Sequence, residues 1–317
     1  WDKMTILTKL DKEDFDEILK NYNLGVYKNH KHIFSGGNTV YKLTTTRGTF
    51  ILKIHERESL AFVKYQIKLM KFLKKTKVSV PRIIDTKQRK GLLIWNKKRI
   101  IIQDFAIGRE IQYADERLAK DMGEKYGSLD KILFKFKERR YWEYRDEQFK
   151  LMKWKIKSLF GLDLLKESTN LLKEIKKLNR NKLKRSLIHA DLCEGNVLVK
   201  NNKVSAIIDW GDVHEDYLVY ELAIPIAHNF VTRKTVRRNL IKVFLKEYQK
   251  HIKLNDEEKK ALYLFVKHRE LSAGSWSYNQ IKKHKDKKKE LTRWTKICIE
   301  KYKAFNKLSL TDFLSLF

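Results

Sequence analysis

Residues 187–212 read LIHADLCEGNVLVKNNKVSAIIDWGD, and this stretch decides the fold. Apolar, strand-like runs alternate in it with polar turns, so that two acidic loops are bracketed by segments with the composition of buried strands. Polar loops held on a rigid scaffold are where catalytic residues concentrate. The stretch therefore marks the centre of a candidate active site.

Four polar residues of this stretch have a defined spacing. His189, Asp191 and Asn196 follow the pattern H-x-D-x-x-x-x-N, and Asp209 comes after the next predicted hairpin in an aspartate, aromatic, glycine triplet. This is the spacing of a kinase catalytic loop followed by a metal-binding loop. Taken singly, each aspartate could cap a helix or form a turn. Their joint placement in one short stretch favours the catalytic interpretation.

On these residues the chain resembles the aminoglycoside phosphotransferase and choline kinase-like branch of the protein-kinase superfamily. The resemblance implies a kinase that transfers the γ-phosphate of ATP or GTP to a hydroxyl group, with Mg²⁺ as cofactor. In that chemistry Asp191 orients or deprotonates the acceptor hydroxyl, whereas Asn196 and Asp209 supply the hard oxygen ligands that Mg²⁺ prefers. His189 is expected to support the loop rather than to react.

The fold class expected from the resemblance is α+β, a two-lobed protein-kinase-like fold. The first hundred residues agree with a small antiparallel-sheet N-lobe, because β-branched and aromatic runs alternate with turn signals and residues 59–74 carry one amphipathic helix. After Gly108 the sequence becomes helix-rich, as expected for a larger, mainly helical C-lobe. The boundary is placed between residues 1–105 and residues 106–317. Helices of the C-lobe are expected at residues 116–135, 147–178, 235–251, 256–278 and 290–305.

The resemblance also indicates which N-lobe residues would contact the nucleotide. Lys53 lies on a predicted strand, where the family has a lysine that pairs with the α- and β-phosphates. The preceding turn would offer backbone N–H groups to phosphate, or it is a plain hairpin turn. The backbone at residues 103–105 would read the edge of the purine. The complete set of expected nucleotide-binding residues is Lys53, Ser35, Gly36, Gly37, Asn38, Gln103, Asp104 and Phe105.

One residue departs from the family pattern in the N-lobe. The family has a glutamate on the N-lobe helix that pairs with the strand lysine, whereas this chain has Gln66 there and Glu58 one or two turns earlier. Gln66 could accept a hydrogen bond from Lys53, or Glu58 could reach the lysine instead. Both alternatives stay open.

Three features favour a small-molecule acceptor over a protein: the loop reads HAD where protein kinases have HRD, the A-P-E signature is missing, and helices follow almost at once. Residues 66–70 and 211–224 look most like hydroxylysine kinase and homoserine kinase-like members, which implies an amino acid or amino alcohol as acceptor. An aminoglycoside is the alternative. Candidate acceptor contacts are Asp212, Glu215, Tyr217 and Glu221, with Arg269 for an acceptor carboxylate. Acidic residues of this kind can equally cap helices or pair with arginine.

Composition limits the other functional classes. The chain has 70 Lys and Arg against 39 Asp and Glu, a formal net charge of +31. A nucleic-acid partner is therefore one alternative, and a non-catalytic kinase-fold scaffold is another, but the lysines are scattered along predicted helices, which favours a solvated surface. The two cysteines lie far apart, and no apolar run is long enough to cross a bilayer, so a cytoplasmic protein without a membrane partner is expected.

Overall fold

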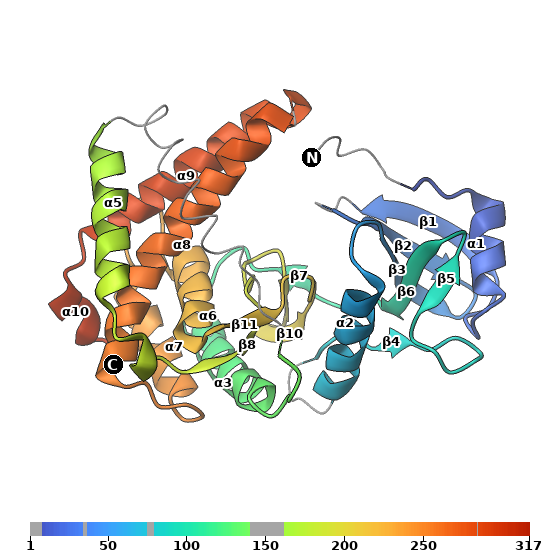
Figure 1. Cartoon of the computed structure of the whole chain (residues 1–317), viewed down its shortest axis with the longest axis horizontal. Coiled ribbons are helices and arrows are strands. Elements are labelled where there is room, and N and C mark those ends of the chain that lie inside the picture. The colour runs from blue at the N-terminus through green and yellow to red at the C-terminus, as the bar shows by residue number, and fades with distance from the viewer. Residues whose placement is uncertain (1–7, 34–36, 75–78, 140–161, 284) are drawn as a thin grey trace. The chain divides into compact units, whose positions relative to one another are not determined.

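The computed structural model describes residues 8–33, 37–74, 79–139, 162–283 and 285–317. The chain divides into two compact units, Trp1–Ile107 and Gly108–Phe317, and each unit is described by itself. The first is built on an antiparallel sheet and the second is mainly helical (Figure 1). None of the helices among the described residues combines the length and apolar character of a membrane span.

The sheet of the first unit has the strand order β1-β2-β3-β6-β4, with β5 paired to β6, and its strand pairs are antiparallel. Two helices accompany it. Helix α2 begins where the Ser59 hydroxyl accepts a hydrogen bond from the Phe62 N–H group, which caps an otherwise unpaired donor. Helix α1 was not predicted from the sequence. The elements are α1 (Lys12–Leu19), β1 (Tyr27–Ile33), β2 (Thr39–Thr45), β3 (Gly48–His55), α2 (Leu60–Leu73), β4 (Ile83–Ile84), β5 (Leu93–Trp95) and β6 (Lys98–Asp104).

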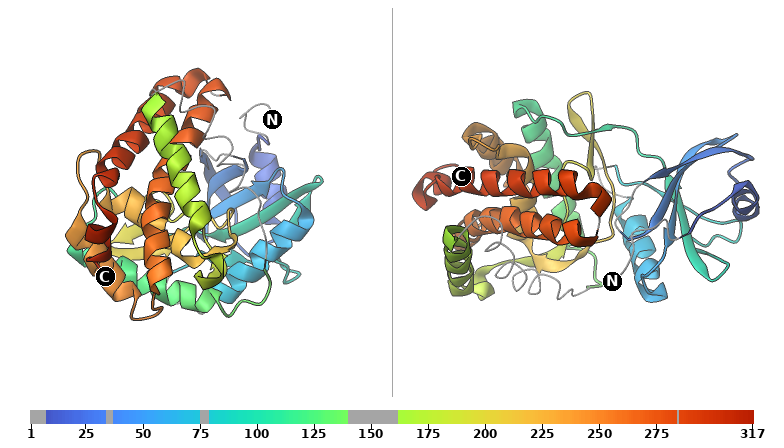
Figure 2. Two further views of the ribbon diagram at one scale, coloured as in Figure 1. Left: turned by 60° about the vertical axis from the view of Figure 1, so that its left-hand side comes forward. Right: turned by 90° about the horizontal axis from the view of Figure 1, so that it is seen from above.

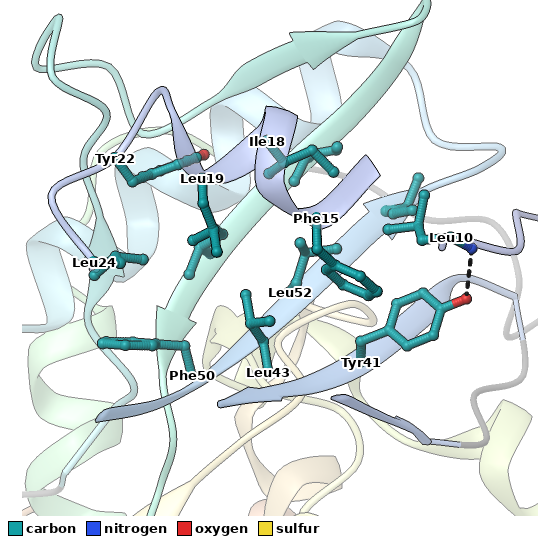
Figure 3. Close-up of a cluster of buried hydrophobic side chains, with 13 residues drawn as sticks. Leu10, Phe15, Ile18, Leu19, Tyr22, Leu24, Tyr41, Leu43, Phe50 and Leu52 are labelled. Atoms are coloured by element: carbon teal, nitrogen blue, oxygen red, sulfur yellow. Dashed lines mark hydrogen bonds between the residues drawn. The ribbon is translucent and has the colours of Figure 1, made fainter. Parts of the chain in front are cut away.

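A hydrophobic cluster joins α1 to the sheet (Figure 3). Phe15 and Ile18 of α1 are fully buried with Leu43 and Leu52 of the sheet. Alternate residues of β2 are buried because successive side chains of a strand point to opposite faces. Tyr41 accepts a hydrogen bond on its hydroxyl from the N–H group of Leu10, which fixes the chain that leads into α1.

The second unit combines helices with short strands in two small sheets, ordered β10-β9-β7 and β11-β8. Helices α8 and α9 run side by side (Figure 1 and Figure 2). The helices expected after Gly108 are present, except that residues 147–161 of the one expected at 147–178 lie outside the described residues. The elements are β7 (Arg109–Glu110), α3 (Glu116–Leu133), α5 (Leu162–Lys177), β8 (Arg185–Ile188), β9 (Val197–Lys200), β10 (Lys203–Ile207), β11 (His214–Tyr217), α6 (Leu218–Pro225), α7 (Arg238–Tyr248), α8 (Asp256–Lys283), α9 (Lys288–Asn306) and α10 (Leu310–Leu314).

Helices α3 and α7 pack unusually closely because two glycines share one face of α3. Gly123 and Gly127 are four residues apart, so they lie one above the other. A Cβ atom on Gly123 would lie 2.3 Å from the carbonyl oxygen of Phe244, and one on Gly127 would lie 2.9 Å from that of Tyr248. The backbones thus approach to a distance that no side chain would allow.

The hairpin of β9 and β10 turns at two asparagines. Asn201 and Asn202 have φ angles of 52° and 57°. Two consecutive left-handed residues form a type I′ turn, whose twist matches that of antiparallel strands and which asparagine tolerates well. The register pairs Val197 with Ile207, so the residues on either side of the hairpin are brought together.

Candidate active site

The β9–β10 hairpin places Asn196 beside Asp209. Asn196 directly precedes β9, and Asp209 follows β10 after one residue. The N–H group of Ile208 donates to the carbonyl oxygen of Asn196 at 2.9 Å, which extends the pairing past the strand ends. Asp209 has a φ of 57°, a left-handed conformation that aspartate adopts more readily than most residues.

Asp191 lies in the tight loop that leaves β8. The side-chain amide of Asn196 donates to the Asp191 carboxylate oxygen Oδ2 at 2.7 Å and to its main-chain carbonyl oxygen at 3.0 Å. Because the amide nitrogen makes both bonds, the amide oxygen of Asn196 is the atom suited to a cation. Cys193 lies nearby with its Sγ atom 3.7 Å from Asp191, but burial raises the pKa of its thiol to about 12, which does not suit a nucleophile.

His189 supports this loop through contacts of both its ring nitrogens. It is fully buried, accepts a hydrogen bond on Nδ1 from the N–H group of Asp191 at 3.3 Å and contacts the Ile208 carbonyl oxygen through Nε2 at 2.9 Å. Nε2 therefore carries the proton and donates it. Burial lowers the pKa of His189, in spite of the neighbouring Asp191 charge, so the neutral ring is favoured. Its edge packs on buried Trp210, whose Nε1 group donates to the Ile207 carbonyl oxygen.

Glu221 holds the same loop through its backbone. This glutamate of α6 is fully buried and accepts hydrogen bonds from the N–H groups of His189, at 2.6 Å, and Ala190, at 2.9 Å. Ala190 has a φ of 68°, so the loop takes a strained turn where Glu221 binds it. Burial raises the pKa of Glu221 to about 7. The structure thus places this acceptor candidate away from solvent, with both carboxylate oxygens bonded to the protein.

The other three acidic and aromatic acceptor candidates, Glu215, Tyr217 and Asp212, differ in burial and in their partners. Glu215 pairs with Arg185 Nε at 3.2 Å, and Tyr217 is buried and stacks on Phe265 with ring centroids 6.2 Å apart. Asp212 is exposed. Of these three residues, Asp212 is the one whose side chain faces solvent.

Arg269 of α8 binds the candidate catalytic aspartate. Its Nη2 atom donates to Asp191 Oδ1 at 2.5 Å, and its Nε atom donates to His228 Nε2 at 3.2 Å. Burial would lower the pKa of Arg269, but the Asp191 charge outweighs it and raises the pKa above the ordinary value, so the guanidinium stays charged. The sequence suggested Arg269 for an acceptor carboxylate, whereas the structure directs it to a carboxylate of the protein itself.

Two further residues next to Arg269 were missed by sequence reasoning. His228 Nδ1 lies 2.8 Å from Glu194 Oε2. Burial alone would raise the pKa of Glu194, but the hydrogen bond from His228 lowers it to about 2. His228 follows an apolar helix, and no spacing in the sequence links it to the loop of Asp191.

In the first unit, Lys53 is buried in the centre of β3, between Val40 of β2 and Ile101 of β6. Ser35 and Gly36 lie outside the described residues. Gly37 and Asn38 precede β2, and the side chain of Asn38 donates to Glu58 at 2.6 Å and accepts from the N–H group of Glu56 at 3.2 Å. Asn38 therefore ties its turn to the segment that follows β3.

The two possible partners of Lys53 have different surroundings. Burial would raise the pKa of Glu58, but the nearby His55 ring, whose Nδ1 lies 3.7 Å from Glu58 Oε2, and the hydrogen bond from Asn38 outweigh it and lower the pKa to about 2. Gln66 is buried on α2, and its amide oxygen accepts no hydrogen bond from the described residues. Glu58 is thus a charged group that already accepts a hydrogen bond within the first unit. Gln66 is a neutral group whose amide oxygen is available as an acceptor.

The residues expected to read the purine lie at the end of β6. Gln103 and Asp104 belong to the strand, and the Asp104 N–H group donates to the Arg82 carbonyl oxygen at 2.9 Å. The Asp104 carboxylate also pairs with Arg82 Nε at 3.1 Å. Phe105 follows the strand and is partly exposed, with Lys42 Nζ 4.5 Å from its ring centroid.

The donor set at the second unit's loops fits a magnesium ion. No cluster of three or more histidine, cysteine or acidic ligands occurs within the described part of the chain. Asn196 and Asp209, at the two ends of the β9–β10 hairpin, would supply two oxygen donors. Mg²⁺ is commonly bound by one or two protein oxygens, with water and nucleotide phosphates completing its octahedron. The residues present therefore suit Mg²⁺ bound together with a nucleotide.

Comparisons with known proteins agree with this geometry. The model of the phosphotransferase enzyme family matches residues 34–262. Homoserine kinase of Gluconobacter oxydans (strain 621H) is 26% identical over 272 residues, which are 82% of this chain and 84% of that protein.

Two solved structures are similar over nearly their whole length. An amicoumacin kinase in complex with AMP-PNP, Ca²⁺ and Ami has a TM-score of 0.73 at 18% identity and covers 97% of this chain and 98% of its own. A microcompartment-associated aminopropanol kinase has a TM-score of 0.66 at 15% identity and covers 97% of this chain and 100% of its own. At these identities the likeness concerns the fold alone, and it confirms the predicted protein-kinase-like class.

Proposed function

Because the chain belongs to the phosphotransferase enzyme family and is a kinase acting on hydroxyl acceptors, we propose that it phosphorylates an amino acid or amino alcohol, with ATP or GTP as donor. One observation carries the proposal. A side-chain hydrogen bond joins Asn196 to Asp191, and the β9–β10 hairpin brings the chain just before Asp209 back to Asn196 through the bond from the Ile208 N–H group to the Asn196 carbonyl oxygen. This is the arrangement that phosphoryl transfer requires, because a hydroxyl and a metal-bound nucleotide must meet in line.

In this proposal Asp191 acts on the acceptor. One of its oxygens accepts a hydrogen bond from the acceptor hydroxyl and directs its oxygen at the γ-phosphorus. As the new O–P bond forms and the bond to the β-phosphate oxygen breaks, the hydroxyl proton passes to Asp191 and a nucleoside diphosphate leaves. The transition state of such reactions is loose, so orientation matters more than the basicity of the carboxylate.

The remaining predicted site residues bind the nucleotide. Asn196 and Asp209 would hold Mg²⁺, which when bound neutralises charge on the phosphates. We assign Lys53 to the α- and β-phosphates and the turn Ser35, Gly36, Gly37 and Asn38 to backbone contacts with phosphate. Gln103, Asp104 and Phe105 are assigned to the purine. His189 supports the loop that carries Asp191.

Two lines of support favour an amine-bearing acceptor. Relatives and structural neighbours include a homoserine kinase and an aminopropanol kinase, whose named substrates both carry an amine and a hydroxyl. Asp212 is an exposed carboxylate three residues after Asp209, and a carboxylate is the group that would pair with an ammonium. The second candidate is an aminoglycoside-type antibiotic, since aminoglycoside phosphotransferases are also among the structural neighbours.

The test is an assay of nucleoside diphosphate release with ATP and GTP, Mg²⁺ and a panel of acceptors: homoserine, hydroxylysine, aminopropanol, ethanolamine, choline, amicoumacin and aminoglycosides. Asp191→Ala should abolish turnover. Asp256→Ala, which removes a carboxylate that is 97% exposed at the start of α8, should not. Turnover confined to the antibiotics would move the assignment to the second candidate. A chain that binds neither nucleotide would refute both.

A further inference from the structure

Four side chains lie in a hydrogen-bonded row in the second unit. Glu194 Oε2 is 2.8 Å from His228 Nδ1, Arg269 Nε donates to His228 Nε2 at 3.2 Å, and Arg269 Nη2 donates to Asp191 Oδ1 at 2.5 Å. The two middle members are the most buried, with side-chain exposures of 5% for His228 and 16% for Arg269. The row therefore passes through the protein interior and has a more exposed carboxylate at each end, Glu194 at one and Asp191 at the other.

The chemistry of the groups fixes the protons of this row. A guanidinium can only donate hydrogen bonds, so His228 Nε2 must accept. The ring proton then sits on Nδ1 and is donated to the Glu194 carboxylate. Arg269 therefore donates to His228, and His228 donates to Glu194. The neutral His228 ring lies between the charged Arg269 and Glu194 side chains.

His228 is itself held in place from three sides. It lies in the turn Ile226–Phe230, which is closed by a π-helical hydrogen bond from the Val231 N–H group to the Ile226 carbonyl oxygen at 3.2 Å. Single π-helical turns of this kind often occur at functional sites. Lys301 Nζ donates to the His228 carbonyl oxygen at 3.1 Å, and the Trp294 ring stacks on the imidazole at 6.3 Å.

Arg269 and Asn196 together restrain both oxygens of the Asp191 carboxylate. Arg269 binds Oδ1, and Asn196 donates to Oδ2 at 2.7 Å. Each carboxylate oxygen has more than one acceptor direction, so Asp191 can still accept a hydrogen bond from a substrate hydroxyl. The two contacts prevent the Asp191 carboxylate from rotating away from that hydroxyl.

We propose that Arg269 is a positioning residue that sets the orientation of the Asp191 carboxylate, and that His228, backed by Glu194, sets the plane of the guanidinium. The proposal rests on the function proposed above, in which Asp191 directs the acceptor hydroxyl. A planar guanidinium suits the task because its fixed fork reaches two acceptors at once, whereas a lysine ammonium is a single point charge.

Arg269→Ala should lower kcat by about 100-fold, because a displacement of a reacting group by about 1 Å costs that much. The KM for the nucleotide should stay unchanged, since Arg269 holds Asp191 and not the nucleotide. Added guanidinium at millimolar concentration should restore part of kcat, which a merely structural defect would not allow. Arg293→Ala is the matched control, because Arg293 is an exposed arginine of α9 outside the row. A wild-type kcat in Arg269→Ala would overturn the proposal.

Arg269→Lys covers the case in which the alanine variant does not fold. The ammonium can pair with Asp191 but cannot bond His228 in the same geometry, so kcat should fall by at least about 10-fold. Wild-type kcat in this variant would show that charge suffices and would also overturn the proposal.

Failure of the inference can be told apart from failure of the proposed function. Loss of turnover in Asp191→Ala, with full turnover in Arg269→Ala, would refute the role of Arg269 alone. If the wild-type protein turns over no acceptor, crystal structures of the wild type and of Arg269→Lys still give a result. A rotated Asp191 carboxylate in the variant is expected, and an identical orientation in both would contradict the proposal.

Discussion

At the scale of single residues, Glu221 shows how a buried carboxylate holds the loop that carries Asp191. Two consecutive backbone N–H groups, those of His189 and Ala190, donate to its two oxygens. Next to it in the interior, burial raises the pKa of Asp130 as well, and Tyr248 donates to that carboxyl at 2.7 Å. Two buried carboxyl groups thus share one region, and neither is ionised as readily as in water.

Glu221 predicts a specific dependence of stability on pH. Its pKa is raised from 4.5 to about 7 in the folded protein, so the folded state binds this proton more tightly than the unfolded state. Its contribution to the free energy of unfolding is full below pH 4.5 and is lost as the pH rises to about 7. The loss is on the order of 3 kcal/mol. Urea unfolding across this range should show the decline, and Glu221→Gln should flatten it.

A control separates this effect from that of other carboxylates. Glu58 has the opposite shift, with a pKa lowered to about 2, so its contribution is present above pH 4.5 and is lost only as the pH falls towards 2. Glu58→Gln should therefore change the acid limb and leave the decline between pH 4.5 and 7 in place. A decline that persists unchanged in Glu221→Gln would contradict the assignment.

The site residues predicted from the catalytic-loop spacing are local in sequence. His189, Asp191, Asn196 and Asp209 lie in one loop and one hairpin, so the chain itself brings them together. Arg269 was singled out for an acceptor carboxylate, and its contact with Asp191 was not predicted, because that contact depends on how α8 packs and no short-range pattern encodes that packing. For Glu221 the sequence left an acceptor contact and a structural role open, and its place as a lone carboxylate within the apolar run LVYELAIP accords with the burial that the structure shows.

At the scale of elements, the packing of α3 on α7 depends on glycine. Gly123→Ala should destabilise the protein by about 1–3 kcal/mol, because the new methyl group would meet the Phe244 carbonyl oxygen and overpack the contact. Alanine is a better helix former than glycine by about 1 kcal/mol, so helix propensity alone would predict a gain in stability. Thermal or urea unfolding decides between the two effects.

Gly195→Ala is the matched control for this substitution. A Cβ atom on Gly195 would meet nothing within 4 Å, so its stability should change by less than about 0.5 kcal/mol. Equal effects of the two substitutions would show that α3 and α7 can move apart without cost, contrary to their close packing.

Helices with a clear apolar period were predicted well, whereas α1 was not. Helix α1 has eight residues, KEDFDEIL, with three apolar side chains, which is too short for the period to stand out. What defines it is a capping box, in which Asp11 and Asp14 each accept a hydrogen bond from the backbone N–H group of the other. Its burial comes from the tertiary cluster around Phe15, which the sequence alone does not reveal.

At the scale of the whole molecule, the formal charge of +31 predicts binding to polyanions without a role in catalysis. Affinity for duplex DNA should fall by roughly 1,000-fold between about 50 and 200 mM salt, because released counterions drive such binding. Phosphate transfer should be unaffected by DNA at the higher salt concentration. Fluorescence polarisation of labelled DNA of two unrelated sequences measures this binding. Salt-resistant, sequence-selective binding would support the nucleic-acid alternative.

The indole of Trp210 provides the site with an optical reporter. Trp210 directly follows Asp209, is buried and has the His189 ring 4.7 Å from its own. A protonated imidazole quenches indole emission, whereas the neutral ring that burial favours at His189 does so far less. In a variant whose other six tryptophans are replaced by phenylalanine, a change in Trp210 emission on adding metal and nucleotide would test the proposed role of Asp209 in real time, without any coupled assay or knowledge of the acceptor.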